Sequence, residues 1–194
     1  MSNNIESESW LKSEFEQNIG LIKDYDGKII DIIKFYFTLL LGIMSVVVAI
    51  IKFSGFNDYI YLLGIISLTF SFAGHLLLLW IYKLRSYFVL AARQINAVRK
   101  YYREILPDEL KEIIIQPTNV KYPGYYHKSS SHIIAMYLII FFNAFAICVS
   151  SYIFISPCKI CTSTIIILSI IIGIIDAIIF NYILSHKLKE KENE

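Results

Sequence analysis

Charged and uncharged stretches alternate along this chain, and four long stretches carry almost no charge. The runs without Asp, Glu, Lys or Arg are Phe35–Ile51, Tyr59–Tyr82, Ile133–Ile155 and Thr164–Ser185, the last interrupted only by Asp176. A helix needs about 20 apolar residues to cross a hydrocarbon core of about 30 Å. The pattern therefore predicts an all-α, polytopic membrane protein with four transmembrane helices.

Composition favours a membrane protein over a soluble one. Hydrophobic residues make up 56% of the 194 residues, whereas soluble domains average about 45–50%. The segment Met1–Glu8 is polar and acidic, without the basic and apolar regions of a secretory signal. We therefore expect the first apolar run to remain in the mature protein as an anchor.

Basic residues are distributed unequally between the two sides of the predicted spans. Of the 18 Lys and Arg residues, all but Lys52 and Lys159 lie in the N-terminal arm, between the second and third runs, or in the C-terminal tail. Because cytoplasmic loops carry an excess of Lys and Arg, both termini are expected in the cytoplasm, with the chain in the cell inner (plasma) membrane. The predicted divisions are a cytoplasmic amphipathic helical arm (1–34), transmembrane helices 1 and 2 (35–82), a cytoplasmic helical extension and loop (83–131), transmembrane helices 3 and 4 (132–185) and a cytoplasmic tail (186–194).

Two segments outside the apolar runs carry a four-three spacing of apolar positions, which is typical of helices that pack along each other. The second seam continues the second span into the cytoplasm until Pro107, which ends the helix. In the first seam, Asn18 is a candidate for fixing the register of packing. A helix lying on the membrane surface remains an alternative for this arm. The seam positions are Leu11, Phe15, Asn18, Ile22, Tyr25, Ile29 and Ile32 in the arm, and Leu84, Phe88, Ala91, Ile95, Val98, Tyr102 and Ile105 after the second span.

A basic face follows the second span and is a candidate cytoplasmic interface. It carries Arg93, Arg99, Lys100 and Arg103, while the arm before the first span is acidic. We expect these residues to hold the topology and to pair with the acidic arm. Membrane lipid, further copies of the chain and a cytoplasmic protein are the expected partners, and nucleic acid is not.

Polar residues occur at similar depths in three of the predicted spans. Asp176, Asn143 and His75 lie within about 6 Å of one another in depth, at 1.5 Å of helix per residue. A carboxylate in the hydrocarbon core costs about 2.5–3.5 kcal/mol, so Asp176 is expected to have a partner or water. One interpretation is a polar cluster that lines an ion or proton route. The alternative is a hydrogen-bonded network that only holds the helices together.

Small residues recur at four-residue intervals in the fourth span, at Ser169, Gly173 and Ala177. Small side chains let helix backbones approach closely, which is the usual way helices associate in lipid. We therefore expect this face to pack on another helix, in the same subunit or in a neighbouring one.

A pair of cysteines is a further candidate functional site. Cys158 and Cys161 form a CxxC motif in the short loop on the predicted non-cytoplasmic side, where a disulfide is possible. A membrane thiol-disulfide redox protein is therefore one alternative, but a redox relay would need a second pair, and the remaining cysteine is Cys148. The histidines are too scattered for a zinc site, and no metal or cofactor is expected.

The order of elements resembles small membrane effectors of bacterial antiphage defence systems, which have two or four spans. The resemblance covers the arm, the first two spans, the helical extension around Arg93–Tyr102 and the final two spans. It implies an oligomeric membrane effector, channel-like pore or signal transducer that is not an enzyme. The alternative is a non-conducting scaffold that recruits a cytoplasmic partner through residues 83–128. Soluble catalytic motifs such as GxSxG or HExxH do not occur in the sequence.

Overall fold

A computed structural model describes residues 2–54, 56–107, 117–125, 127, 129–157 and 162–193 of the chain. Within these residues the protein contains four long helices, and a long segment, residues 106–130, separates the second from the next. Each helix contains a stretch long and apolar enough to cross a membrane, which confirms the all-α class and the prediction of four apolar spans. The helices are α1 (Ser2–Ser54), α2 (Phe56–Ile105), α4 (Ser131–Ile155) and α5 (Thr162–Asn193).

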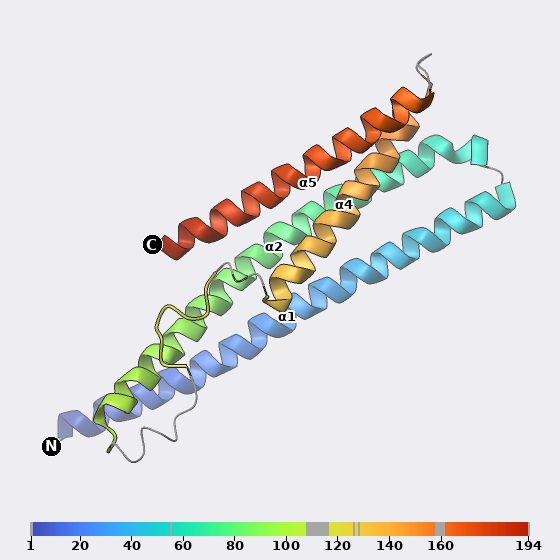
Figure 1. Ribbon diagram of the computed structural model, residues 1–194. Coiled ribbons are helices and arrows are strands. Elements are labelled where there is room, and N and C mark those ends of the chain that lie inside the picture. Colours follow the sequence, from blue (N-terminus) through green and yellow to red (C-terminus); the bar gives the residue numbers. More distant parts are fainter. Residues whose placement is uncertain are drawn as a thin grey trace.

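The helices pack in chain order, and α1 and α2 form a long antiparallel hairpin (Figure 1). The helix α4 lies along the half of α2 nearest the α1–α2 connection, and α5 lies along α4. The other halves of α1 and α2 continue past the start of α4 (Figure 1). We call this part the extension, comprising residues 8–25 of α1 and 86–105 of α2.

The extension is held by the two predicted seams. On α1, Asn18 is buried, and on α2 Ala91 and Ile95 are 3% exposed each. The rings of Tyr25 and Tyr87 lie 5.6 Å apart between the two helices. The arm thus packs along α2 and does not lie apart from it, while Trp10 of α1 is 60% exposed.

The continuity of α2 follows from its sequence. Its 50 residues give a length of about 75 Å at 1.5 Å per residue. Pro is absent between Phe56 and Ile105. The helix ends two residues before Pro107, because proline cannot continue the hydrogen-bond ladder and disfavours a helical conformation in the residue before it. The same helix therefore contributes both to the apolar layers and to the extension.

The buried centre lies between α1, α2 and α4. Tyr36, Leu78, Ile81 and Ile139 are fully buried there. By contrast, α5 exposes a large share of its isoleucines, including Ile167 and Ile178 at 57% and 61%. An apolar surface of this kind fits contact with lipid or with another protein surface.

Candidate functional site

A histidine and a carboxylate meet inside the apolar layers, where α2 passes α5. His75 Nε2 lies 3.3 Å from Asp176 Oδ2, and their side chains are 12% and 15% exposed. The contact is at ion-pair distance, but neither atom has a hydrogen-bond partner of good geometry among the described residues. The His75 ring also stacks on Phe180, with the ring centroids 3.7 Å apart. The two titratable groups are therefore partners that lack a full set of hydrogen bonds.

An open groove of about 350 Å³ surrounds this pair. Its walls are apolar, and it faces the outside of the protein, since Phe72 and Leu68 are 65% and 50% exposed. His75 and Asp176 are the titratable residues that line it. The remaining lining residues are Ser71, Leu76, Leu79, Ile147 and Phe180.

Asn143, predicted from its depth to join this pair, has other partners. The Tyr36 hydroxyl donates a hydrogen bond of 3.0 Å to Asn143 Oδ1, and the Ser71 hydroxyl donates to the Asn143 backbone carbonyl at 3.3 Å. The Asn143 side chain packs directly on Gly74, where an added Cβ would lie 2.6 Å from Asn143 Nδ2. Depth alone did not distinguish the two faces of α2, because His75 and Gly74 are neighbours in sequence but face different helices.

Tyr36 is a residue whose role the sequence pattern did not reveal. Its place within Phe35–Phe37 suggests an aromatic residue at the membrane interface, yet Tyr36 is fully buried while Phe35 is 59% exposed. The hydroxyl reaches across from α1 to α4 and joins the first helix to Asn143. Predicting that Tyr36 is buried while its neighbour Phe35 is exposed would require knowing which face of α1 is turned toward the other helices.

A second polar network lies where the extension meets α4; we call it the junction and define it by Asp26, Arg85 and His132. His132, at the start of α4, places Nε2 at 2.8 Å from Asp26 Oδ1 on α1. On its other side, Arg85 Nη1 donates to His132 Nδ1 at 3.3 Å. The junction therefore connects three helices through side chains alone.

Arg85 is the buried centre of the junction, with 2% of its surface exposed. It donates from Nε to the carbonyl of Tyr125 at 2.8 Å, from Nη2 to the carbonyl of Gly124 at 3.2 Å, and from Nη1 to the Ser130 hydroxyl at 2.8 Å. Only the planar fork of a guanidinium can satisfy acceptors in these several directions. Arg85 was not among the predicted interface residues, because its partners are mainly backbone carbonyls that sequence patterns do not reveal.

The predicted interface residues on α2 contact the loop, their own helix and one residue of the arm. Arg93 Nε donates to the Pro123 carbonyl at 3.2 Å and its guanidinium lies over the Tyr125 ring. Arg103 reaches Thr118, and Lys100 pairs with Glu104 on its own helix. Arg99 lies over the ring of Phe15 on the arm.

Asn18 is buried at the seam, but its hydrogen bonds stay within α1. Its side-chain amide donates to the Glu14 carbonyl at 2.8 Å and approaches the Glu14 carboxylate at 3.4 Å. The described contacts thus place Asn18 in the interface without a hydrogen bond across it.

The small residues of α5 face α4 within the same chain. Ser169 is 1% exposed and donates to the Ile165 carbonyl of its own helix. At Gly173 an added Cβ would lie 2.8 Å from the Ala144 carbonyl oxygen and 3.2 Å from the Cys148 Cβ. Ala177 is partly buried against the core. The close approach of α5 to α4 therefore depends on Gly173.

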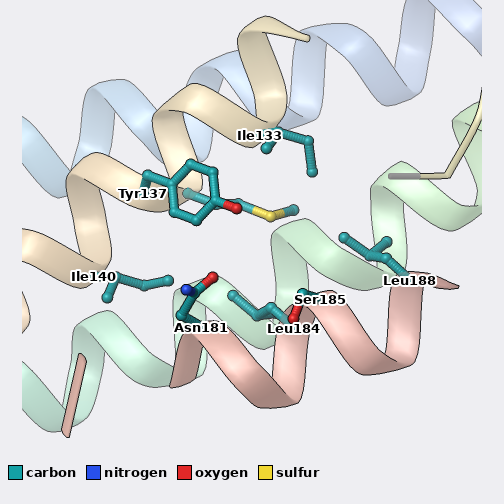
Figure 2. Close-up of a pocket in the computed structure, with 8 residues that line it drawn as sticks. Ile133, Tyr137, Ile140, Asn181, Leu184, Ser185 and Leu188 are labelled. Carbon is teal, nitrogen blue, oxygen red and sulfur yellow. The ribbon is translucent and has the colours of Figure 1, made fainter. Parts of the chain in front are cut away.

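A small crevice lies farther along the same interface (Figure 2), where side chains of α4 and α5 meet. Tyr137 comes from α4, while Asn181 and Ser185 come from α5. The space is about 10 Å³, which is enough for about one water molecule. It is a packing defect between two helices and too small for a substrate.

The described part of the chain contains no candidate metal site, and one free thiol lies in it. No group of three or more His, Cys, Asp or Glu residues there could hold a metal ion. Cys148 is a free thiol on α4. The predicted disulfide pair, Cys158 and Cys161, lies outside the described residues.

The fold and these polar contacts define an all-helical protein with four helices long and apolar enough to cross a membrane. Comparison with protein-family models, with curated proteins and with solved structures finds no match to the chain in any of the three. Inference about its function therefore rests on the geometry of the chain itself.

Proposed function

We propose that this chain is an oligomeric integral membrane protein that acts as an effector, with His75 and Asp176 forming part of a proton or cation route. In this proposal both termini lie in the cytoplasm and the chain resides in a bacterial inner membrane. The observation that carries it is the pairing of two titratable side chains in an apolar groove. A role in antiphage defence is supported by the order of elements alone.

The pair suits proton transfer because one proton can reside on either partner. A protonated His75 beside an ionised Asp176 and a neutral His75 beside a protonated Asp176 have the same net charge. Neither arrangement leaves an isolated charge in the hydrocarbon layer, where a lone carboxylate costs about 2.5–3.5 kcal/mol. Ionisable residues in membrane helices commonly mark ion pathways or proton relays.

The shape of the groove supports an oligomer. In one chain the groove is open along its side, at the exposed Phe72 and Leu68. A second copy would close this side and convert the groove into an enclosed route. The apolar surface of α5 provides area for such a contact.

The junction supports a signalling role for the extension. Asp26, His132 and Arg85 connect α1, α4 and α2 at the base of the extension. A change in packing of the extension would reach α4 through these hydrogen bonds. We therefore include signal transduction from the extension to the apolar layers in the proposal.

Proton flux into liposomes tests the proposal directly. Purified protein is placed in liposomes loaded with a pH-sensitive dye, and flux is measured under a potassium diffusion potential. We expect Asp176→Asn to abolish flux and His75→Gln to reduce it strongly. The assembly state, measured by gel filtration with light scattering, should not change in either variant.

The matched control is Asp31→Asn, which removes a carboxylate from an exposed position on α1, where its side chain is 77% exposed. Flux in this variant should equal that of the wild type. Wild-type flux in Asp176→Asn would contradict a route through this carboxylate. A wild-type protein without flux to protons, sodium or potassium would contradict conduction and favour the second candidate.

The second candidate is a non-conducting scaffold that recruits a cytoplasmic protein through residues 83–128. It is favoured by the extension, whose loop is tied to α2 by Asn96, which donates to the carbonyls of Asn119 and Tyr122 at 3.2 and 2.6 Å. Val120 and Tyr122 on this loop are 42% and 47% exposed.

Point substitutions test the scaffold better than a deletion, because removing residues 108–128 would also remove the carbonyls that hold Arg85. Val120→Asp and Tyr122→Ala should abolish crosslinking to a partner in cells, while Trp10→Ala, at an exposed site on α1, should not. Unchanged crosslinking in both loop variants would exclude this surface.

A further inference from the structure

The extension contains an open, groove-like cavity that the proposed function does not use. It has a volume of about 320 Å³ and lies between the arm, α2 and the loop of residues 117–123. Ile22 lines it from α1, Phe88, Ala92, Asn96 and Arg99 from α2, and Tyr122 from the loop, together with two prolines. The volume is within the range of about 300–1,000 Å³ that is typical of small-molecule sites.

Arg99 is the cation in the lining, and its hydrogen-bonding capacity is poorly used. Its Nη1 donates to Asn96 Oδ1 at 3.3 Å, and its guanidinium lies 5.8 Å from the centroid of the Phe15 ring. Its Nε is buried without a hydrogen-bond partner among the described residues. Within that part of the chain no carboxylate lies at ion-pair distance from Arg99. Burial lowers the pKa of the guanidinium, although arginine stays charged at neutral pH.

Such a residue differs from its neighbours on the same helix. Arg93 and Arg103 both bond to the loop, and Lys100 pairs with Glu104. A buried donor that lacks a partner is destabilising, so an unsatisfied group of this kind commonly marks the place of a missing ligand, water or ion. The group that would complement a guanidinium lacking a carboxylate partner among the described residues is an anion.

Asn96 makes hydrogen bonds through both ends of its side-chain amide. Its amide nitrogen donates to two loop carbonyls, and its oxygen accepts from Arg99. It holds the loop over the cavity and orients the guanidinium. The rest of the lining is apolar or aromatic, with Phe88 and Tyr122 offering flat surfaces.

We infer that this cavity binds a small organic anion, in which a phosphate or carboxylate pairs with Arg99 and a flat apolar body lies among Phe88, Ala92 and Tyr122. The inference is independent of whether the protein conducts ions.

The anion would come from solution rather than from a lipid headgroup. Arg99 lies 17 residues beyond Tyr82, the end of the second apolar run, which is about 25 Å along a straight helix. The headgroup layer on one side of a bilayer is only about 5–8 Å thick. In the proposed topology, the cavity is therefore out of reach of the membrane surface.

Three probes test the anionic group and the flat apolar body of the ligand separately. 1-Naphthyl phosphate carries both, inorganic phosphate carries the anion alone, and 1-naphthol carries the apolar body alone. Binding of each to the full chain in phosphatidylcholine nanodiscs is measured by titration calorimetry against empty nanodiscs. We expect saturable binding of 1-naphthyl phosphate, and binding at least about tenfold weaker for each of the other two. A tenfold ratio corresponds to about 1.4 kcal/mol, which the loss of one charge-assisted hydrogen bond can account for.

Two substitutions test the cavity itself. Arg99→Gln removes the cation and Ala92→Phe fills the space, and each should weaken binding of 1-naphthyl phosphate at least about tenfold. The matched controls are Arg103→Gln, which removes an equal charge one turn away, and Leu90→Phe, which enlarges an exposed side chain outside the cavity. Both controls should bind within about twofold of the wild type, since neither Arg103 nor Leu90 lines the cavity.

Each contrary result overturns the inference in a defined way. Absence of saturable 1-naphthyl phosphate binding, or equal binding by wild type, Arg99→Gln and Ala92→Phe, would exclude the site. Equal binding of inorganic phosphate would exclude a role for the apolar lining. Loss of binding in nanodiscs that contain phosphatidylglycerol would show that a lipid headgroup occupies the site. Circular dichroism and gel filtration of each variant establish folding, and Ala92→Phe tests the cavity where Arg99→Gln does not fold.

Discussion

His132 Nε2 lies 2.8 Å from Asp26 Oδ1, a contact between residues 106 positions apart in the chain. Arg85 fixes the direction of this hydrogen bond. Because a guanidinium can only donate, His132 Nδ1 must accept from Arg85. The ring proton then resides on Nε2 and is donated to Asp26, so His132 is neutral in this arrangement.

The role of Asp26 as an acceptor gives the first prediction. Asp26→Asn keeps an oxygen at the same place and should cost less than about 0.5 kcal/mol, whereas Asp26→Leu should cost about 1 kcal/mol. The larger value is modest because the Asp26 side chain is 46% exposed. Thermal unfolding in detergent measures both, and equal losses in the two variants would argue against a hydrogen bond to His132.

Arg85→Met should be far more destabilising. It leaves the carbonyls of Gly124 and Tyr125 without their buried donor, and we expect a loss of about 3 kcal/mol in unfolding free energy. Lys83→Met, at an exposed position on the same helix, should change stability by less than about 0.5 kcal/mol. Similar values for the two variants, from denaturant titration, would exclude Arg85 as the centre of the junction.

The hydrogen bond between Tyr36 and Asn143 supplies a third prediction. Tyr36→Phe removes the donor to Asn143 Oδ1 and should cost about 0.6–1.7 kcal/mol, the range found for side-chain hydrogen bonds between membrane helices. Tyr61→Phe removes a hydroxyl from a tyrosine that is 54% exposed and should be neutral. Unfolding in mixed detergent micelles measures the difference. When Asn143 is replaced by Leu in both backgrounds, the difference should fall to the contribution of the longer hydrogen bond from the Tyr36 hydroxyl to the Ile139 carbonyl, at 3.4 Å.

Replacing glycine by alanine should destabilise the protein where two helices approach closely and should be tolerated where the glycine faces open space. Gly173→Ala would bring a Cβ to 2.8 Å from the Ala144 carbonyl oxygen, and Gly74→Ala would collide with the Asn143 side chain. Both should lower the melting temperature, since overpacking costs about 1–3 kcal/mol. Gly42→Ala is the control, because its Cβ meets nothing within 4 Å. Tolerance of Gly173→Ala would contradict the packing of α5 on α4.

At two other glycines of α1 the same substitution should stabilise. Gly20 and Gly27 lie within α1, and a Cβ at either position meets nothing within 4 Å. Alanine should therefore raise stability by about 0.5–1 kcal/mol at each site through helix propensity alone. Gln17→Ala, at an exposed site in the same helix, should change it by only a few tenths of a kcal/mol. A loss of stability in Gly20→Ala would mean that another surface packs on this face.

Sequence patterns predicted the helices well because each depends on local periodicity. Hydropathy located the four apolar spans, and the four-three seams located the extension, with Pro107 marking its end. The pairing of His75 with Asp176 was also within reach, because few titratable groups occur in the apolar runs and depth can be counted along a helix.

The junction and the partner of Asn143 were not predictable in the same way. Arg85 binds backbone carbonyls about 40 positions away, and backbone acceptors have no signature in the sequence. Tyr36 and Asn143 required the rotational phase of two helices, which depth does not provide. Arg99 was predicted as part of a basic face, but nothing in its spacing distinguished it from Arg93 or Arg103.

The uninterrupted course of α2 has a mechanical consequence. His75 and Arg85 are ten residues apart on it, about 15 Å along the axis, with no break or proline between them. A rotation of the helix that withdrew Arg85 from the loop carbonyls would turn His75 through the same angle, away from Asp176. The two polar sites therefore share one rotational coordinate, and neither can rearrange by helix rotation while the other stays in place.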